Sequence, residues 1–153
     1  MPVRTYDPKQ CLVTIGGVPM SGFADGTFVS IERTSDTFTK VSGADGIVSR
    51  AKTNDRSGTL TLTLAQTSPS NDVLSGFAQK DELTNAGIVP VLVKDISGRS
   101  TYVSGFAWVK KPPTGEFGKE IADREWALDL ADLEIFTGGN ADIGMGGIPI
   151  PGL

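Results

Sequence analysis

The chain has 153 residues, enough for one domain that buries roughly 70% of its unfolded surface. A domain of this size needs no disulfide or metal ion to be stable. Fourteen lysines and arginines against 18 aspartates and glutamates leave a net charge of −4. This balance argues against a general nucleic-acid binder, because phosphate contacts need cations. The absence of histidine removes the commonest general base and histidine metal sites.

Two further features of the composition bear on the compartment. Cys11 is the single cysteine, which excludes an intrachain disulfide, and we expect a small buried residue rather than a reactive thiol. The first eight residues lack the apolar segment of a signal peptide, and no apolar run approaches the length of a membrane span. We therefore expect synthesis in a cytoplasm, followed by use as a soluble or an assembled protein.

Short alternating segments at the start of the chain predict antiparallel strands. Residues 11–15 form the first expected strand, Gly16-Gly17 is a two-residue hairpin signal, and residues 18–23 return. Residues 27–33 alternate again, with Glu32 on the polar side.

Residues 34–58 are polar and differ from their surroundings. Asp45-Gly46 lies near the middle of this segment, so we expect a long hairpin with an exposed tip. Such long polar excursions from a compact domain are commonly functional or disordered. The charged residues of interest in this hairpin are Asp36, Lys40, Asp45, Arg50, Lys52, Asp55 and Arg56.

The clearest strand of the chain, residues 59–65, runs directly into a helix. Leu60, Leu62 and Leu64 point to one face and the intervening threonines to the other, which predicts a sheet with one apolar face. Ser68 is a capping residue for the helix and Pro69 suits its first position. The apolar stripe predicts a helix across one end of the sheet; its members are Val73, Leu74, Phe77 and Ala78.

Three more strands are expected in the second half of the chain. Residues 88–95 form one, with Pro90 marking an edge or a bulge, and residues 100–110 form the next. Residues 119–136 give the longest strand pattern. One of its faces carries Trp126, Leu128 and Leu130, and the other carries Ile121, Asp123, Glu125, Ala127, Asp129, Ala131 and Leu133.

These segments sum to about eight strands and one helix. The predicted fold is therefore mainly β, a single domain over residues 1–153 built as an antiparallel β-sandwich or barrel with one α-helix at the end. The Gly/Ile/Pro-rich tail, residues 137–153, is expected to be extended, either loose or lying along a neighbouring surface.

Carboxylates are dense between residues 116 and 134, with seven of them against Lys119 and Arg124. A glycosidase-like pair needs a cleft and an acid kept neutral by burial. Asp123, Glu125 and Asp129 instead alternate along one strand face, which favours a solvated acidic surface. An acidic wall repels phosphate and suits a channel that DNA crosses without binding. No enzyme, cofactor or metal site is predicted.

The joint pattern of three stretches resembles the tail tube proteins of contractile-tailed bacteriophages, which are myovirus-type inner tubes. The stretches are residues 41–50 (VSGADGIVSR), residues 54–75 (NDRSGTLTLTLAQTSPSNDVLS) and residues 124–130 (REWALDL). The last of these is followed further along the chain by Gly138-Gly139-Asn140.

The resemblance implies a structural virion protein. Subunits of such tubes join edge to edge into hexameric rings, lend four strands each to a continuous inner β-barrel, and stack into the conduit for genome ejection. It implies partners that include further copies of the chain, the tail sheath, the baseplate and the tail terminator, with double-stranded DNA passing through the lumen. The expected location is the virion tail, assembled in the host cytoplasm, and no cofactor or membrane anchor is implied. Asp123, Glu125 and Asp129 would face the lumen, and the hairpin 34–58 would reach the next ring.

Alternative interpretations remain open at this point. A phage-like bacteriocin tube or a baseplate ring subunit would share the fold. A monomeric β-sandwich binding module would use Tyr102, Phe106 and Trp108 as an exposed aromatic platform, although we expect these residues to share a buried face.

Overall fold

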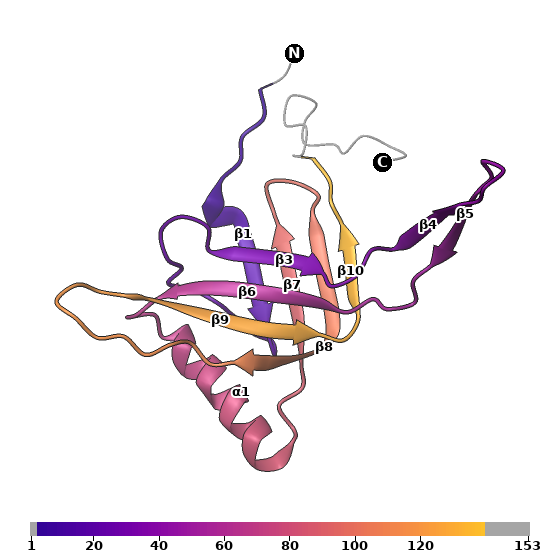
Figure 1. The fold of residues 1–153 in the computed structure, drawn as a ribbon. Coiled ribbons are helices and arrows are strands. Elements are labelled where there is room, and N and C mark those ends of the chain that lie inside the picture. The colour runs from indigo at the N-terminus through magenta and orange to yellow at the C-terminus, as the bar shows by residue number, and fades with distance from the viewer. Residues whose placement is uncertain (1–2, 140–153) are drawn as a thin grey trace.

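The computed structural model describes residues 3–139 as a mainly antiparallel β structure with one α-helix in that range (Figure 1). The predicted fold class is thereby confirmed. Most of the tail 137–153 lies outside the described residues. The elements are η1 (Pro8–Gln10), β1 (Cys11–Ile15), β2 (Val18–Pro19), β3 (Val29–Arg33), β4 (Phe38–Ser42), β5 (Val48–Lys52), β6 (Gly58–Ala65), α1 (Ser70–Thr84), β7 (Val89–Asp95), β8 (Thr101–Lys111), β9 (Asp123–Leu130) and β10 (Leu133–Phe136).

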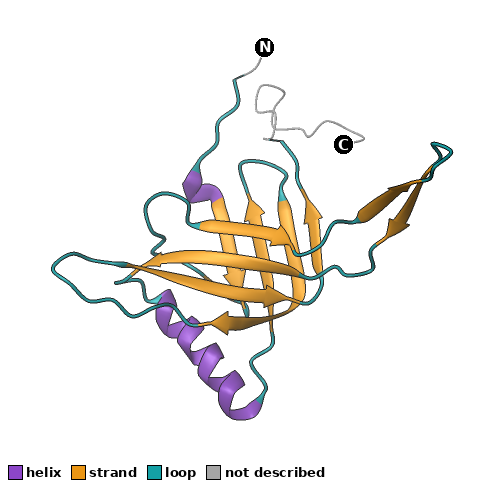
Figure 2. Ribbon diagram, viewed as in Figure 1, coloured by secondary structure: helices purple, strands orange, loops and turns teal. Residues whose placement is uncertain are grey.

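The strands form two crossing layers, as Figure 2 shows. Hydrogen bonds join them in the order β2-β1-β7-β8-β9-β6-β3, and β10 also pairs with β8. We call β3, β6, β9 and residues 107–111 of β8 the four-strand layer; the other strands of this order and β10 form the second layer. Among the described residues, the order ends at β2 and β3 and does not close into a barrel.

The core lies between the two layers, because alternation turns one side of every strand inward. In β6 the burial alternates without a break, so the leucines are buried and the threonines are not. The four-strand layer contributes Leu60, Leu62, Leu64, Trp126, Leu128 and Leu130, and the second layer contributes Val13, Ile15, Val91, Val93 and Leu133.

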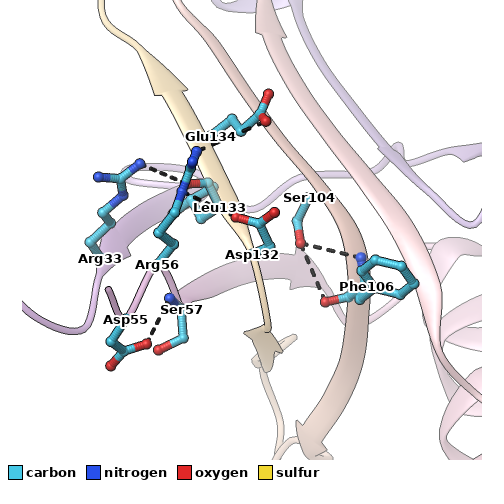
Figure 3. Close-up of polar contacts among 9 residues, drawn as sticks. All are labelled: Arg33, Asp55, Arg56, Ser57, Ser104, Phe106, Asp132, Leu133 and Glu134. Atoms are coloured by element: carbon cyan, nitrogen blue, oxygen red, sulfur yellow. Dashed lines mark hydrogen bonds and ion pairs between the residues drawn. The ribbon is translucent and has the colours of Figure 1, made fainter. Parts of the chain in front are cut away.

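Strand β8 belongs to both layers and changes face in the middle. Ser104 and Ala107 are both buried although they are three residues apart, so the alternation breaks between them. Ser104 Oγ donates to Phe106 O (3.3 Å) and accepts from Phe106 N–H (3.4 Å), which holds the bulge (Figure 3). The prediction that Phe106 is buried is wrong: its side chain is 61% exposed. Tyr102 packs against the core, whereas Trp108 lies opposite Asp129 on the other side of the sheet.

The long strand predicted over residues 119–136 is two strands. β9 ends at Leu130, the chain turns at Ala131 and Asp132, and β10 then pairs with the first half of β8. Leu133 is fully buried, against the expectation that it shares the polar face of β9. The turn moves Leu133 into the second layer, where it lies opposite Ser104.

Helix α1 covers one end of the core, as predicted. Ser68 Oγ accepts from Ser70 N–H (3.2 Å), so Ser68 caps the first turn. Leu74 is fully buried. Trp126 Nε1 donates to Asn71 Oδ1 (2.9 Å), which joins the helix to β9. The helix ends at Thr84, and the next residue, Asn85, caps it in the left-handed conformation (φ 58°).

Candidate assembly site

The outer side of the four-strand layer is a polar face. The alternation places Ser30 and Glu32 of β3 on this side, together with the three threonines of β6. From β9 it receives Glu125, Ala127 and Asp129. The register puts one residue from each strand into a single row across the layer: Glu32, Thr59, Asp129 and Trp108. We call this surface the open face.

The three acids predicted to share one strand face lie on the open-face side of β9. Glu125 is exposed, and Asp129 is partly buried beside Trp108. Asp123, the first residue of β9, is exposed at the end of the layer. Sequence reasoning missed Glu32 as a member of this group. The signal was present in the alternation of β3, which already set Glu32 opposite the apolar side.

The four-strand layer has an unpaired edge on each side among the described residues. β3 pairs with β6 alone, and residues 108–111 of β8 pair with β9 alone. Strand directions alternate across the layer, so these two edge strands run in opposite directions. Unpaired edges present backbone donors and acceptors to another chain.

A second feature is the arm, residues 34–57, which projects away from both layers (Figure 1). Its strands β4 and β5 pair only with each other, and every residue in them is exposed. The arm carries the charged residues predicted for contacts between rings, and the structure divides them into three groups: the cations on one side of the β4–β5 ribbon, the acids, and Arg56 at the root.

The first group lies on one side of the β4–β5 ribbon. Lys40 lies directly opposite Arg50, and Phe38 lies opposite Lys52. The Arg50 guanidinium lies 4.1 Å from the centre of the Phe38 ring, a cation–π contact. We call Phe38, Lys40, Val48, Arg50 and Lys52 the basic face of the arm. Within residues 3–139, no carboxylate forms an ion pair with its three cations.

The acids of the arm lie at its tip and at its base, and two of them accept hydrogen bonds from neighbouring residues. Asp45 Oδ1 at the tip accepts from Ile47 N–H (3.2 Å). Asp55 at the base accepts from Ser57 N–H (3.0 Å) and Ser35 Oγ (3.2 Å). Hydrogen bonds from Ser57 and then Ser35 hold the pKa of Asp55 below its usual value. Asp36 is exposed near the base.

The third group, Arg56, lies at the root of the arm, where the chain meets the turn between β9 and β10 (Figure 3). Arg56 Nε lies 3.3 Å from Asp132 Oδ1, and Arg56 Nη2 lies 3.9 Å from Glu134 Oε1. Leu133 N–H donates to Arg56 O (2.8 Å), and Arg33 Nη2 donates to Leu133 O (2.9 Å). Arg56 is therefore bonded within its own subunit.

Comparison with known proteins identifies the family. The model of the bacteriophage PhiTE tail tube protein family matches residues 12–138. The chain belongs to this tail tube protein family. Structural protein ORF10 of Pseudomonas phage KPP10 is 35% identical over 147 residues, which is 91% of this chain and 85% of that protein. The chain is a structural phage protein, and the prediction that it is not an enzyme is confirmed.

Solved structures support the fold of this tail tube protein. The cap that terminates the tube of the anti-feeding prophage matches with a TM-score of 0.59 and 13% identity, over 88% of this chain and 93% of that chain. A chain of the PVC sheath–tube complex, an extracellular contractile injection system, matches with a TM-score of 0.59 and 14% identity, over 87% and 92%. A chain of a gene transfer agent virion matches with a TM-score of 0.56 and 11% identity, over 87% and 100%.

Residues 3–139 contain no group of three acidic, cysteine or histidine residues placed to hold a metal ion. No helix in the same range has the length and apolarity to cross a membrane. Cys11 is partly rather than fully buried, and burial raises the pKa of its thiol. The raised pKa favours the neutral thiol, in keeping with an unreactive cysteine.

Proposed function

We propose that this protein forms hexameric rings that stack into the inner tube of a contractile tail, the conduit through which the genome enters the host. The observation that carries the proposal is a four-strand antiparallel layer with one core side, one open polar side and two unpaired edges. Joining identical copies at these edges would supply each edge strand with the neighbour that it lacks.

The strand directions are compatible with a closed ring of copies related by rotation. Because β3 and residues 108–111 of β8 run in opposite directions, joining them between copies makes an antiparallel pair at every junction. Six copies supply twenty-four strands. With strands about 4.8 Å apart and tilted by about 45°, the ring has a backbone diameter of roughly 50 Å. Side chains then leave a lumen wide enough for duplex DNA.

The open face would line this lumen. Asp123, Glu125 and Asp129 are proposed as lumen-facing residues, and Glu32 joins them through the register of β3. These carboxylates outnumber Lys111, which lies opposite Ala127 on the same face, so the face as a whole repels phosphate and DNA slides without specific binding. The arm would reach the next ring and hold the stack.

The partners are proposed from the neighbours of the fold. One solved neighbour comes from a sheath–tube complex and another from a tube terminator. We propose that this tube likewise meets a sheath, a terminator and a baseplate, that it is assembled in the host cytoplasm, and that it ends in the virion tail. The match to a phage family and to a phage structural protein favours a tail tube over a bacteriocin tube.

Electron microscopy of the purified protein tests the proposal. We expect rings at low concentration and tubes at high concentration, with sedimentation rising accordingly. Deleting residues Lys40 to Lys52 should leave a folded subunit that forms no tubes, because these residues are exposed and remote from the core. A wild-type protein that sediments as a monomer at every concentration and salt would refute the proposal.

A further inference from the structure

A pocket opens between the first turns of α1, the start of β9 and the loop 112–122, which extends to the left in Figure 1. Its volume is about 440 Å³, within the range usual for small-molecule sites. Pro112, Pro113 and Phe117 give it an apolar wall on the loop side. Among the described residues, Arg124 is the one charged residue in its lining. We call this cavity the Arg124 pocket.

The side chain of Arg124 is a buried cation without a counter-ion. The residue is 8% exposed, and no carboxylate of residues 3–139 forms an ion pair with it. Its Nη2 donates to Glu116 O (2.9 Å), and its guanidinium lies 5.1 Å from the centre of the Phe117 ring. The carbonyl and the ring hold the guanidinium in place, but neither neutralises its charge. Because an unpaired buried charge is costly, an anion that enters the pocket would be stabilised.

The exposed charges around the pocket do not already supply that anion. On the loop and at the adjoining ends of β8 and β9, exposed lysines and exposed carboxylates are equal in number: Lys110, Lys111 and Lys119 against Glu116, Glu120 and Asp123. Water and salt screen these charges, whereas the buried Arg124 is screened much less. Arg124 therefore sets the sign of the electrostatic potential inside the pocket.

Two uncharged donors accompany Arg124. Gln66 Oε1 accepts from Ala122 N–H (3.0 Å), which leaves the amide N–H groups of Gln66 as donors at the pocket. Ser75 of α1 also lines the pocket, and its hydroxyl has no hydrogen-bond partner among the described residues. The pocket thus combines a guanidinium and neutral donors with an apolar wall.

This combination favours a carboxylate carried on an apolar stem. A guanidinium binds the two oxygens of a carboxylate in a planar, bidentate geometry. A single cation suits a monoanion better than a phosphate dianion, which typically draws on several cations or on backbone N–H groups. Phe117 and the two prolines beside Arg124 offer the stem an apolar contact.

We propose that the Arg124 pocket is a binding site for a carboxylate on an apolar stem. The carboxylate can belong to a small molecule or to an acidic side chain of a second copy in the tube. The pocket lies within a single subunit, so binding of a small carboxylate does not depend on assembly. Only the second source rests on the proposed function.

Titration of the free subunit with benzoate tests the site. Benzoate carries a carboxylate on an aromatic ring, benzamide has nearly the same shape without the charge, and inorganic phosphate is an anion without the stem. Trp126 lines the pocket and is one of two tryptophans, so Trp108→Phe makes the remaining fluorescence report on the pocket. Sodium chloride keeps the ionic strength equal in all titrations.

Two variants in this single-tryptophan background remove the site in different ways. Arg124→Gln removes the charge. Gln66→Glu retains Arg124 and an acceptor for Ala122 N–H but places a carboxylate in the pocket, so it tests the site even where Arg124→Gln loosens the loop. The matched controls, Arg4→Gln and Gln79→Glu, make the same changes at exposed positions outside the pocket. Circular dichroism and thermal melting establish that each variant is folded.

Benzoate should bind with a Kd on the order of 1 mM, because one charge-assisted contact and one apolar contact support only a weak complex. Benzamide and phosphate should bind about tenfold more weakly or not at all. Both pocket variants should weaken benzoate binding by about tenfold or more, and both controls should stay within about twofold of their parent. Benzoate that binds no better than benzamide overturns the site. A folded Gln66→Glu variant that binds benzoate as its parent does also overturns it.

Assembled tubes identify the source of the carboxylate. If a side chain of a second copy fills the pocket, tubes should bind benzoate about tenfold more weakly than free subunits, and benzoate but not benzamide should raise the protein concentration at which tubes appear. If the source is a small molecule, tubes and subunits should bind benzoate alike. Saturation-transfer NMR measures binding to both. A wild type that forms no tubes would refute the stacking of rings but would leave the titration of the subunit, and the carboxylate site, intact.

Discussion

Arg56 Nε lies 3.3 Å from Asp132 Oδ1, so the root of the arm is bonded to the turn between β9 and β10. The two residues are 76 positions apart in the chain (132 − 56). Both side chains are about half exposed, and an exposed ion pair contributes little to the free energy of unfolding. Its consequence is geometric: together with the backbone bond from Leu133 N–H to Arg56 O, it fixes the direction in which the arm leaves the body.

Arg56→Gln should loosen the arm with little loss of stability. We expect the free energy of unfolding in urea to fall by about 1 kcal/mol or less, because the pair is exposed. Amide hydrogen exchange in residues 38–52 should nevertheless become faster than in the wild type. Lys80→Gln, an exposed cation on α1, is the control. Unchanged exchange in the arm of the Arg56 variant would show that the backbone contacts alone orient it.

Asp55 should make folding stability depend on acid pH. Its pKa is lowered in the folded state by hydrogen bonds from Ser57 and Ser35, so the ionised form favours folding. This stabilisation is present above the unfolded pKa of about 3.9 and is lost as the pH falls through the lower folded pKa. Asp55→Asn should therefore be less stable than the wild type near neutral pH, and the difference should shrink below about pH 4.

Denaturant titrations between about pH 2 and pH 7 measure this difference. Asp36→Asn, an exposed carboxylate at the same end of the arm, is the control. A gap between Asp55→Asn and the wild type that stays constant over the whole range would contradict the assignment.

Leu62→Ala should destabilise the subunit strongly. Leu62 is fully buried in the middle of β6, opposite Val29 and Trp126. Removing its side chain leaves a cavity between the layers, for which we expect a loss of about 2–5 kcal/mol in the free energy of unfolding. Thr61→Ala, on the open face of the same strand, should change it by about 0.5 kcal/mol or less. Similar losses in both variants would mean that the two faces of β6 are misassigned.

Glu125→Lys with Asp129→Lys should permit tube assembly and slow the passage of DNA. Both side chains belong to the open face, and lysines there attract the phosphates that the wild-type face repels. The measurement is the rate of genome ejection from particles carrying the variant. The uncharged pair Glu125→Gln with Asp129→Asn separates loss of repulsion from gain of attraction. An ejection rate equal to that of the wild type would argue against a lumen location for this face.

The parts of the fold that could be predicted are those whose alternation is uninterrupted. β6 keeps a period of two over its whole length, and Trp126, Leu128 and Leu130 do the same in β9. β8 could not be predicted in the same way, because the bulge near Phe106 shifts the alternation by one residue. Gly105 was the available signal, since glycine inside a strand often marks a bulge.

The sequence also could not predict where β9 ends or how the root of the arm is held. Neither glycine nor proline marks the turn at Ala131 and Asp132, so the pattern reads as one long strand. The pairing of Arg56 with Asp132 depends on tertiary packing between distant segments. Local periodicity carries no information about such a contact.

The bend in β8 also has a mechanical consequence. One backbone passes from the second layer into the four-strand layer, so the two layers share a covalent strand as well as packed side chains. A force applied to one layer is therefore transmitted to the other through the peptide bonds of β8. Separating the layers would require breaking the backbone hydrogen bonds between β8 and β9, or those between β8 and its partners β7 and β10. The subunit should therefore resist shear between its two layers.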